Sequence, residues 1–164
     1  MTLPEAQLNR LKNHVNSGRS LIGFRTASHA FENWKAWDNT VLGGNYHGHH
    51  ANTLAATARI NPAAAGHPIL QGVAAEFVTG GSLYQTSPLT TPDQPLLIGS
   101  IAGQTPEPMA WTHRHQNGRI FYTSLGDPKD FASQPFNAAV APDTRRPWGA
   151  NPARRGRSHQ SGWA

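Results

Sequence analysis

The segment from Leu3 to Phe24 constrains the fold most, because a helix, a glycine and a strand follow one another there. Apolar residues recur at helical spacing, at Leu8, Leu11 and Val15. This spacing predicts an amphipathic helix from Leu3 to Asn16, which Gly18 is placed to end. The run from Leu21 to Phe24 is apolar on both faces, as a central strand of a parallel sheet is. Such a tandem is typical of an α/β protein.

The rest of the chain predicts one more helix and several strands. Phe31 to Leu42 has helical periodicity and is expected to form a second helix or a helical turn. Short apolar runs predict strands at 54–60, 77–78, 83–84 and 96–101. Met109 to His113 and Arg119 to Ser124 read as paired strands joined around Asn117-Gly118, a dipeptide that favours hairpin turns. We therefore expect an α/β fold with a parallel sheet, flanking helices and a β-hairpin near residues 109–124.

The first strand is expected to have an open side. A doubly wound sheet normally begins with strands, whereas this chain begins with a helix and reaches its first strand near residue 20. The βα units that would flank Leu21 to Phe24 are not seen, so the sheet is expected to be incomplete. An unpaired strand edge can pair with another chain, which makes a homo-oligomer one expected partner arrangement.

Composition excludes several classes of protein. The 164 residues suit one domain, and 37% apolar with 14% charged residues favour a loop-rich globular chain over a helical bundle. The chain contains no cysteine, which excludes disulfides and a thiol nucleophile. No apolar run is long enough to span a membrane, and the first residues do not form a secretory signal, so we expect a cytoplasmic protein.

The net charge of +5 does not predict a nucleic-acid partner, because it is concentrated at the C-terminus. Five of the fourteen Lys and Arg residues lie in the last twenty positions, at Arg145, Arg146, Arg154, Arg155 and Arg157. A basic face on the folded body would indicate nucleic acid more strongly than such a tail. We expect one domain over residues 1–141, followed by a disordered basic tail over 142–164 that limited proteolysis should trim.

Polar groups follow the first strand directly, in the sequence Arg25-Thr26-Ala27-Ser28-His29. Ligands of open α/β proteins bind at this edge of the sheet. Arg25 can clamp a carboxylate, a phosphate or a sugar hydroxyl, or it can form a structural ion pair with Glu32 or Asp38. Ser28 is expected to cap the turn, because neighbouring residues rarely form a nucleophile–base pair.

A second group of candidates is rich in histidine, the side chain best suited to proton transfer near pH 7. His47, His49 and His50 lie in a loop flanked by glycine, and in an extended segment His47 and His49 point the same way. His113 lies in the predicted hairpin. A divalent metal would need a third ligand, such as His29, His113 or Asp127, and no common metal-binding spacing is present. We therefore expect no cofactor, with a divalent metal at these histidines as the less favoured alternative.

Several motifs resemble, in the same order, those of the ThuA-like (trehalose utilisation) proteins. Gly18–Phe24 is similar to their "G-K-G-L-V-G" strand, Trp34 with Leu42–Tyr46 and Gly48-His49 to "W…L-L-G-G-x-F-x-G-H", His67–Val73 to "H-P-I-x-x-G-L", Ser82–Tyr84 to "E-L-Y", and Pro108–Thr112 with Asn117–Gly126 to "P-V-A-W-T…G-K-G-R-V-F-Y-T-S-L-G-H". Motifs in the right order over residues 3–136 are far more specific than any one of them alone.

The resemblance implies a flavodoxin-like fold of the class I glutamine amidotransferase type and a role in carbohydrate metabolism. The sequence departs from the family at Arg25, where many members have His, and at Asp127, which follows Leu125-Gly126 where the usual motif is Leu-Gly-His. The N-terminal βα region is also not seen, and an Arg/Pro tail replaces the closing helix. Cysteine-dependent glutamine hydrolysis is excluded, because the chain has no thiol.

We therefore expect a pocket for a small carbohydrate, of the trehalose or keto-sugar type. The predicted catalytic residues are Arg25, His29 and His49, and the predicted substrate-binding residues are Asp38, His47, Tyr84 and His113. His49 and Tyr84 are chosen because they lie in the matched motifs. If the chain is an enzyme, it is expected to be of hydrolase or isomerase type. The alternatives are a non-catalytic sugar-binding or assembly module and a truncated, inactive fragment.

Overall fold

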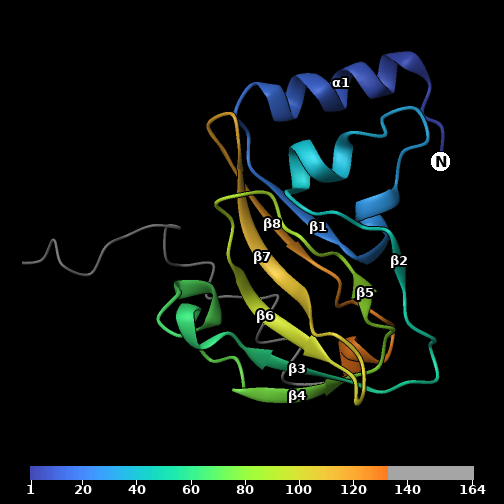
Figure 1. The fold of residues 1–164 in the computed structure, drawn as a ribbon. Coiled ribbons are helices and arrows are strands. Elements are labelled where there is room, and N and C mark those ends of the chain that lie inside the picture. The colour runs from blue at the N-terminus through green and yellow to red at the C-terminus, as the bar shows by residue number, and fades with distance from the viewer. Residues whose placement is uncertain (133–164) are drawn as a thin grey trace, which may run out of the picture.

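Six strands form the main sheet, in the order β1-β8-β7-β6-β3-β4 (Figure 1). A computed structural model describes residues 1–132 of the chain. The strands of this sheet are β1 (Leu21–Phe24), β3 (Ala56–Ile60), β4 (Glu76–Thr79), β6 (Pro95–Ser100), β7 (Glu107–His115) and β8 (Gly118–Thr123). Two further short strands, β2 (Gly48–His49) and β5 (Tyr84–Gln85), pair with each other in an antiparallel ribbon.

The helical segments are short, with one exception. The α-helix α1 spans Glu5–Asn16, within the predicted range. Two single turns lie near it, the 3₁₀ turn η1 (Arg25–His29) and the π-helical turn η2 (Asp38–Leu42). Three more 3₁₀ turns are η3 (Pro62–Ala64), η4 (Pro68–Leu70) and η5 (Asp130–Ala132). Of the two forms predicted for Phe31 to Leu42, a full helix is wrong, whereas a helical turn is present at its end, in η2. The apolar side chains of Trp37, Val41 and Leu42 are still buried, although this segment is mostly loop and turn.

The prediction of a parallel sheet with flanking helices is also wrong. Only β1 and β8 run parallel, and the pairs β8–β7, β7–β6, β6–β3 and β3–β4 are all antiparallel. Parallel neighbours need a crossover connection, usually a helix, whereas antiparallel neighbours need only a turn. Between β3 and β8 the described chain has turns and loops without an α-helix, so its strands pair antiparallel.

The predicted hairpin is confirmed. β7 and β8 pair from Ala110 with Thr123 to His115 with Gly118, around the turn Gln116-Asn117. Gln116 has a φ of 54°, the left-handed backbone that tight hairpin turns require. The two strands carry Trp111 and Tyr122, whose rings pack with their centroids 4.5 Å apart.

Strand β1 lies at the edge of the sheet, as the expected open side requires, and not in its buried centre. Ile22 is 58% exposed and Phe24 is 37% exposed. Only the side of β1 that faces α1 and η2 is covered, where Gly23 lies close to Leu42 and Tyr122. The apolar residues of β1 therefore predicted a strand correctly, but not its burial.

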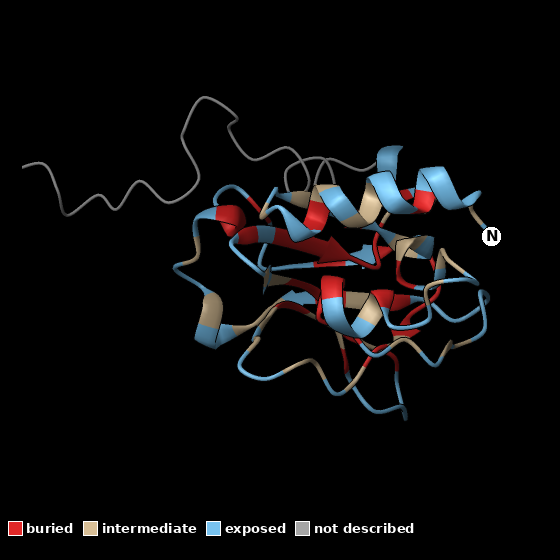
Figure 2. Ribbon diagram, turned by 90° about the horizontal axis from the view of Figure 1, so that it is seen from above, coloured by how far each residue is buried: buried red, intermediate tan, exposed pale blue. Residues whose placement is uncertain are grey.

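Two apolar cores lie on the two faces of the sheet. Side chains alternate along β8, so that Ile120 and Tyr122 belong to one core and Phe121 to the other. The first core also contains residues of α1 and η2, and the second contains Leu97 and the turn η4. In Figure 2 the strands between these layers are mostly red, and the turns around them are mostly pale blue.

Asp130 connects the ends of β4 and β8. Its buried carboxylate accepts hydrogen bonds from the Thr79 hydroxyl (2.8 Å) and from the backbone N–H groups of Gly80 (2.7 Å), Gly126 (2.9 Å) and Asp127 (3.0 Å). The segments that follow both strands are thereby held at one edge of the sheet.

The predicted tail, residues 142–164, lies outside the described residues. Within residues 1–132, no helix has the length and apolarity that a membrane crossing requires.

Candidate functional site

Four of the predicted site residues meet around the ring of Tyr84 in β5. The guanidinium carbon of Arg25 lies 5.3 Å from the ring centroid, and the His29 and His49 rings lie 6.0 Å from it on centroids. Tyr46 completes the group, with its ring 4.9 Å from Tyr84 and stacked on His29 at 4.3 Å. We call these five residues the aromatic cluster.

The cluster forms where β1 ends. Arg25 follows β1 directly, and His29 ends the turn η1 that begins at Arg25. Because β2 pairs with β5, His49 is directly opposite Tyr84. The Glu107 carboxylate fixes the chain just after β5, since it accepts hydrogen bonds from the backbone N–H groups of Thr86 (2.9 Å) and Ser87 (2.8 Å). Segments that are far apart in sequence thus reach one surface.

The backbone of Arg25 has a φ of 42°, in the left-handed region that favours glycine. Two hydroxyls hold this conformation by donating to the Arg25 carbonyl, Tyr122 at 2.7 Å and Ser28 at 3.2 Å. Burial raises the pKa of Tyr122, which keeps this phenol protonated and able to donate. Strained backbone of this kind concentrates at functional sites.

The Arg25 side chain makes no ion pair with an acidic residue of the described part of the chain. Glu32 pairs with Lys35 at 2.7 Å, and Asp38 accepts its hydrogen bond from the Tyr46 backbone. The guanidinium donates to the Ser124 carbonyl at 3.4 Å and faces the Tyr84 ring. Its remaining N–H donors are available to a ligand.

The His29 ring has one nitrogen that can accept a proton. Its Nδ1 lies 3.1 Å from the Ser28 hydroxyl oxygen, whose proton is directed to the Arg25 carbonyl. Nδ1 is therefore the donor, which leaves Nε2 as the acceptor. Burial, and next the nearby charge of His49, lower the pKa of His29, so that the neutral form dominates near pH 7. Ser28 and His29 do contact each other, contrary to expectation, but Ser28 is 4% exposed and caps the turn as predicted.

The histidine loop contributes one residue to the cluster. His49 is exposed, and its Nδ1 donates to the His50 carbonyl at 2.9 Å, which leaves Nε2 as an acceptor when the ring is neutral. The Nδ1 of His47 donates to the Asn45 carbonyl at 2.8 Å, and His47 has no ring contact with the cluster among the described residues. The structure therefore separates His47 from His49.

Asp38 lies behind the cluster. One of its carboxylate oxygens accepts a hydrogen bond from the Tyr46 backbone N–H at 2.6 Å, and the other is buried without a partner among the described residues. Burial raises the pKa of Asp38 to about 6. Asp38 therefore positions Tyr46 and does not face the cluster directly. Sequence reasoning did not select Tyr46, although an aromatic residue in a glycine-rich loop next to His47 was a usable signal.

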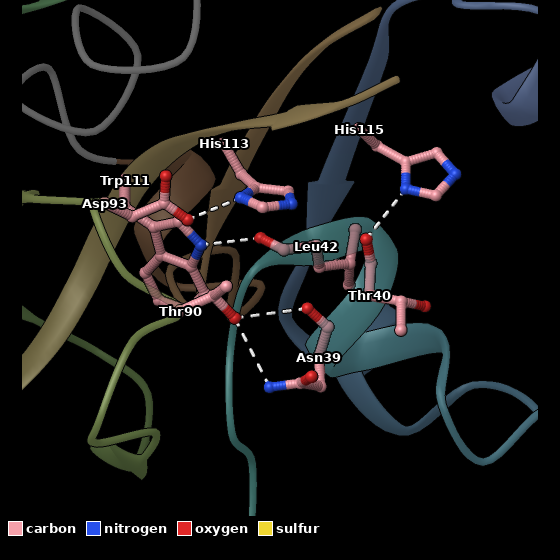
Figure 3. Close-up of polar contacts among 8 residues, drawn as sticks. All are labelled: Asn39, Thr40, Leu42, Thr90, Asp93, Trp111, His113 and His115. Carbon is pink, nitrogen blue, oxygen red and sulfur yellow. Dashed lines mark hydrogen bonds and ion pairs between the residues drawn. The ribbon is translucent and has the colours of Figure 1, made fainter.

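His113 lies beside Asp93 and has no ring contact with the aromatic cluster among the described residues (Figure 3 shows the pair). Its Nδ1 lies 2.5 Å from a carboxylate oxygen of Asp93, and both side chains are about nine-tenths buried. His113 pairs with Ile120, whereas Arg25 follows Phe24, which lies beside Thr123. Along β8, Ile120 and Thr123 are three residues apart, which corresponds to about 10 Å, so His113 and Arg25 lie at different levels of the sheet. His113 therefore does not join the predicted site.

The described residues contain no group of three His, Cys, Asp or Glu side chains that could hold a metal ion. A small apolar cavity lies between residues of the second core, including Leu70, Leu97 and Phe121, and none of its lining residues belongs to the aromatic cluster. His29 and His49 are exposed and Arg25 and Tyr46 are half-buried, whereas Tyr84 is only 4% exposed. The cluster thus presents two imidazoles, one guanidinium and the ring of Tyr46 around a buried Tyr84.

Comparison with solved structures finds the same fold. A ThuA-like protein from Bacteroides uniformis ATCC 8492 has a TM-score of 0.68 at 19% sequence identity, over 85% of this chain and 63% of that chain. A ThuA-like protein from Parabacteroides merdae ATCC 43184 has a TM-score of 0.54 at 18% identity, over 77% of this chain and 56% of that chain. The chain thus spans less than two thirds of either protein.

A search of the curated proteins finds no match. The profile of the ThuA family, described as trehalose utilisation, matches residues 1–141. This match covers most of the chain and agrees with the order of the motifs and with the fold of the two solved structures. The chain therefore belongs to the ThuA family.

Proposed function

We propose that the aromatic cluster binds a small carbohydrate of the trehalose or keto-sugar type. The observation that carries this proposal is the convergence of Arg25, His29 and His49 on the Tyr84 ring. Membership of a family described as trehalose utilisation supports a carbohydrate-related role. Aromatic rings offer an apolar face to the C–H side of a sugar ring, and the polar groups around them bind its hydroxyls.

The same groups suit a proton transfer. In a keto-sugar, the carbon next to the carbonyl loses a proton to a base while negative charge develops on the carbonyl oxygen. The free Nε2 of His29 would accept that proton, and the guanidinium of Arg25 would stabilise the oxygen. For an isomerase, His29 would return its proton to the former carbonyl carbon, and His49 would carry the hydroxyl proton of the neighbouring carbon to the carbonyl oxygen. For a hydrolase, His49 would protonate the oxygen that leaves from the next carbon. Water would then add to the resulting double bond, giving one proton back to His49, while His29 returns its proton to the carbon from which it came. This assignment gives a reaction of isomerase or hydrolase type and needs no cofactor.

Binding and turnover of trehalose and ketotrehalose test the proposal. The variants R25A, H29A and H49A should each weaken binding at least tenfold and lower any turnover by about 10²–10⁴-fold, as the loss of a general acid or base does. H14A on α1 is the matched control, because His14 lies outside the cluster and its ring hydrogen-bonds to the Ser20 carbonyl at 3.4 Å. Binding that is equal in all four variants would refute the proposed site.

A non-catalytic sugar-binding module is the second candidate. The exposed positions of His29 and His49 favour it, because an open surface does not exclude water from a reaction. Calorimetry distinguishes the two candidates. Affinity for the sugar without any conversion over long incubation supports the binding module, whereas conversion that depends on His29 supports the enzyme.

A further inference from the structure

We propose that Asp127 binds the sugar together with Arg25, and that this pair selects a neutral vicinal diol over an anionic group. The inference rests on the proposed function, because it assigns one more residue to the same site. Arg25 follows β1 and Asp127 follows β8, and these strands are the parallel pair of the sheet. Both residues therefore lie at the carboxyl edge of the two strands, where α/β sheets bind ligands.

The two side chains meet over Gly81. A Cβ atom built on Gly81 would lie 2.1 Å from the Arg25 Nη1 and 3.1 Å from the Asp127 Cβ. Both groups are thus packed against the same glycine, and no larger residue fits there while they stay in place. On the other side, the Arg25 Cγ and Cδ lie 3.7 Å from the Cβ position of Gly126. Gly81 and Gly126 thus leave room for the Arg25 side chain on the surface that also carries Asp127.

The Asp127 carboxylate is held in place by one of its two oxygens. One oxygen, Oδ1, accepts a hydrogen bond from the Lys129 backbone N–H at 3.0 Å, and the Asp127 N–H donates to Asp130 at 3.0 Å. Asp127 forms no ion pair with a basic side chain in residues 1–132, and the side chain is half-buried. Its second oxygen is therefore free to accept from a ligand.

Within residues 1–132, the Arg25 guanidinium and the Asp127 carboxylate form no ion pair with each other, although both side chains pack against Gly81. Two adjacent hydroxyls of one ligand can bridge two such groups. Each hydroxyl of a diol can donate to the carboxylate or accept from the guanidinium, so both functions of the pair are satisfied at once. A carboxylate or phosphate on the ligand would gain from Arg25 but would be repelled by Asp127. The Tyr84 ring against which the guanidinium lies is buried, so the apolar face of the site comes from the half-buried ring of Tyr46, 4.9 Å from Tyr84 on centroids.

The test measures the affinity of the full chain for methyl glucoside, its 2-, 3- and 4-deoxy derivatives, and methyl glucuronide. D127N keeps the Oδ1 acceptor for Lys129 and removes the charge, and we expect it to bind methyl glucoside about tenfold more weakly. One deoxy derivative should bind the wild-type chain about tenfold more weakly than methyl glucoside does. D127N should bind that derivative and methyl glucoside with the same affinity, because the missing hydroxyl is the one that Asp127 contacts. G81A, whose methyl group displaces the guanidinium, should weaken binding similarly. E5Q on α1 is the matched control.

Each outcome bears on one proposal or on both. If H29A binds the sugar more weakly than wild type, whereas D127N and G81A bind it as tightly as wild type, the role of Asp127 is overturned and the proposed sugar site stands. Tighter binding of the glucuronide than of the neutral glucoside also overturns the diol assignment. If the wild-type chain binds neither methyl glucoside nor trehalose nor ketotrehalose, the proposed function fails and the role of Asp127 fails with it. Melting temperatures of D127N and G81A within a few degrees of wild type show that the variants are folded.

Discussion

At Arg25 a long, charged side chain occupies a backbone angle that suits glycine. Any residue with a Cβ costs about 1 kcal/mol or more in this region, and the surrounding structure must compensate for that cost. Here the hydroxyls of Tyr122 and Ser28 hold the carbonyl of the strained residue. The sequence thus retains a guanidinium at the cluster in a place where glycine would make the fold more stable.

This cost is measurable by comparing R25G with R25A. Both variants lose the guanidinium, but only glycine relieves the strain at φ 42°, so we expect R25G to be more stable than R25A by about 1 kcal/mol in urea unfolding. The same pair of substitutions at Arg19, just before β1, is the control, and there alanine should be at least as stable as glycine. Equal stability of R25G and R25A would show that the backbone of Arg25 relaxes.

Asp38 makes the stability of the protein depend on pH. Because burial raises its folded-state pKa from 3.8 to about 6, the unfolded chain ionises first as the pH rises. The contribution of Asp38 is therefore most favourable below pH 4, falls between about pH 4 and 6, and stays low above that window. The shift corresponds to about 2–3 kcal/mol. D38N keeps an acceptor for the Tyr46 N–H and cannot ionise.

We expect D38N to unfold at a higher urea concentration than wild type at pH 8, by about 2 kcal/mol, and at nearly the same concentration at pH 4. Urea titrations at the two pH values check this. D93N is a useful second variant, because burial also raises the pKa of Asp93 while its contact with His113 acts in the opposite direction. A D38N variant that is less stable than wild type at both pH values would contradict the assignment.

At the scale of elements, Asp130 joins two strands that do not pair with each other. Its carboxylate accepts four hydrogen bonds, from the ends of β4 and β8. An amide offers one acceptor oxygen and places its NH₂ group against backbone N–H donors. D130N should therefore lose about 3 kcal/mol or more of unfolding free energy. Urea unfolding measures the loss. E76Q is the control, because Glu76 is an exposed residue that pairs with Arg59 and does not contact Asp130, so its substitution should change the stability little.

Local patterns predicted elements better than their arrangement. The Asn117-Gly118 dipeptide located the hairpin, and the spacing of Leu8, Leu11 and Val15 located α1. The direction of pairing depends on which distant strands meet, and this is not encoded within any short window. For the same reason, the apolar run of β1 indicated a strand but placed it in the centre of a parallel sheet, although it lies at an edge.

The site shows the same limit. Arg25, His29, His49 and Tyr84 were selected from motifs and side-chain chemistry, and the fold brings them together. His113 was selected on chemistry alone, but the register of β7 places it away from them, beside Asp93. Tyr46 was missed because its stacking on His29 depends on how the loop after η2 returns to η1.

At the scale of the whole molecule, the two cores share one sheet and should unfold together. Leu97 is 2% exposed in the second core, whereas Trp37 and Trp111 are buried in the first. L97A should lower the stability by about 2–4 kcal/mol. The tryptophan signal in near-ultraviolet circular dichroism should shift to the same midpoint as the far-ultraviolet signal of the backbone. Two separate midpoints would show that the faces unfold independently, as expected for an incomplete domain.

The aromatic cluster draws on three separate stretches of chain, and an unfolded polypeptide does not hold these together. A compound that touches all three recognises only the native state, and it raises the melting temperature further as its concentration increases relative to its Kd. Heating the purified protein with a library of metabolites is therefore a screen that needs no assumption about the chemistry. The compounds that shift wild type but not R25A would identify the natural ligand class directly.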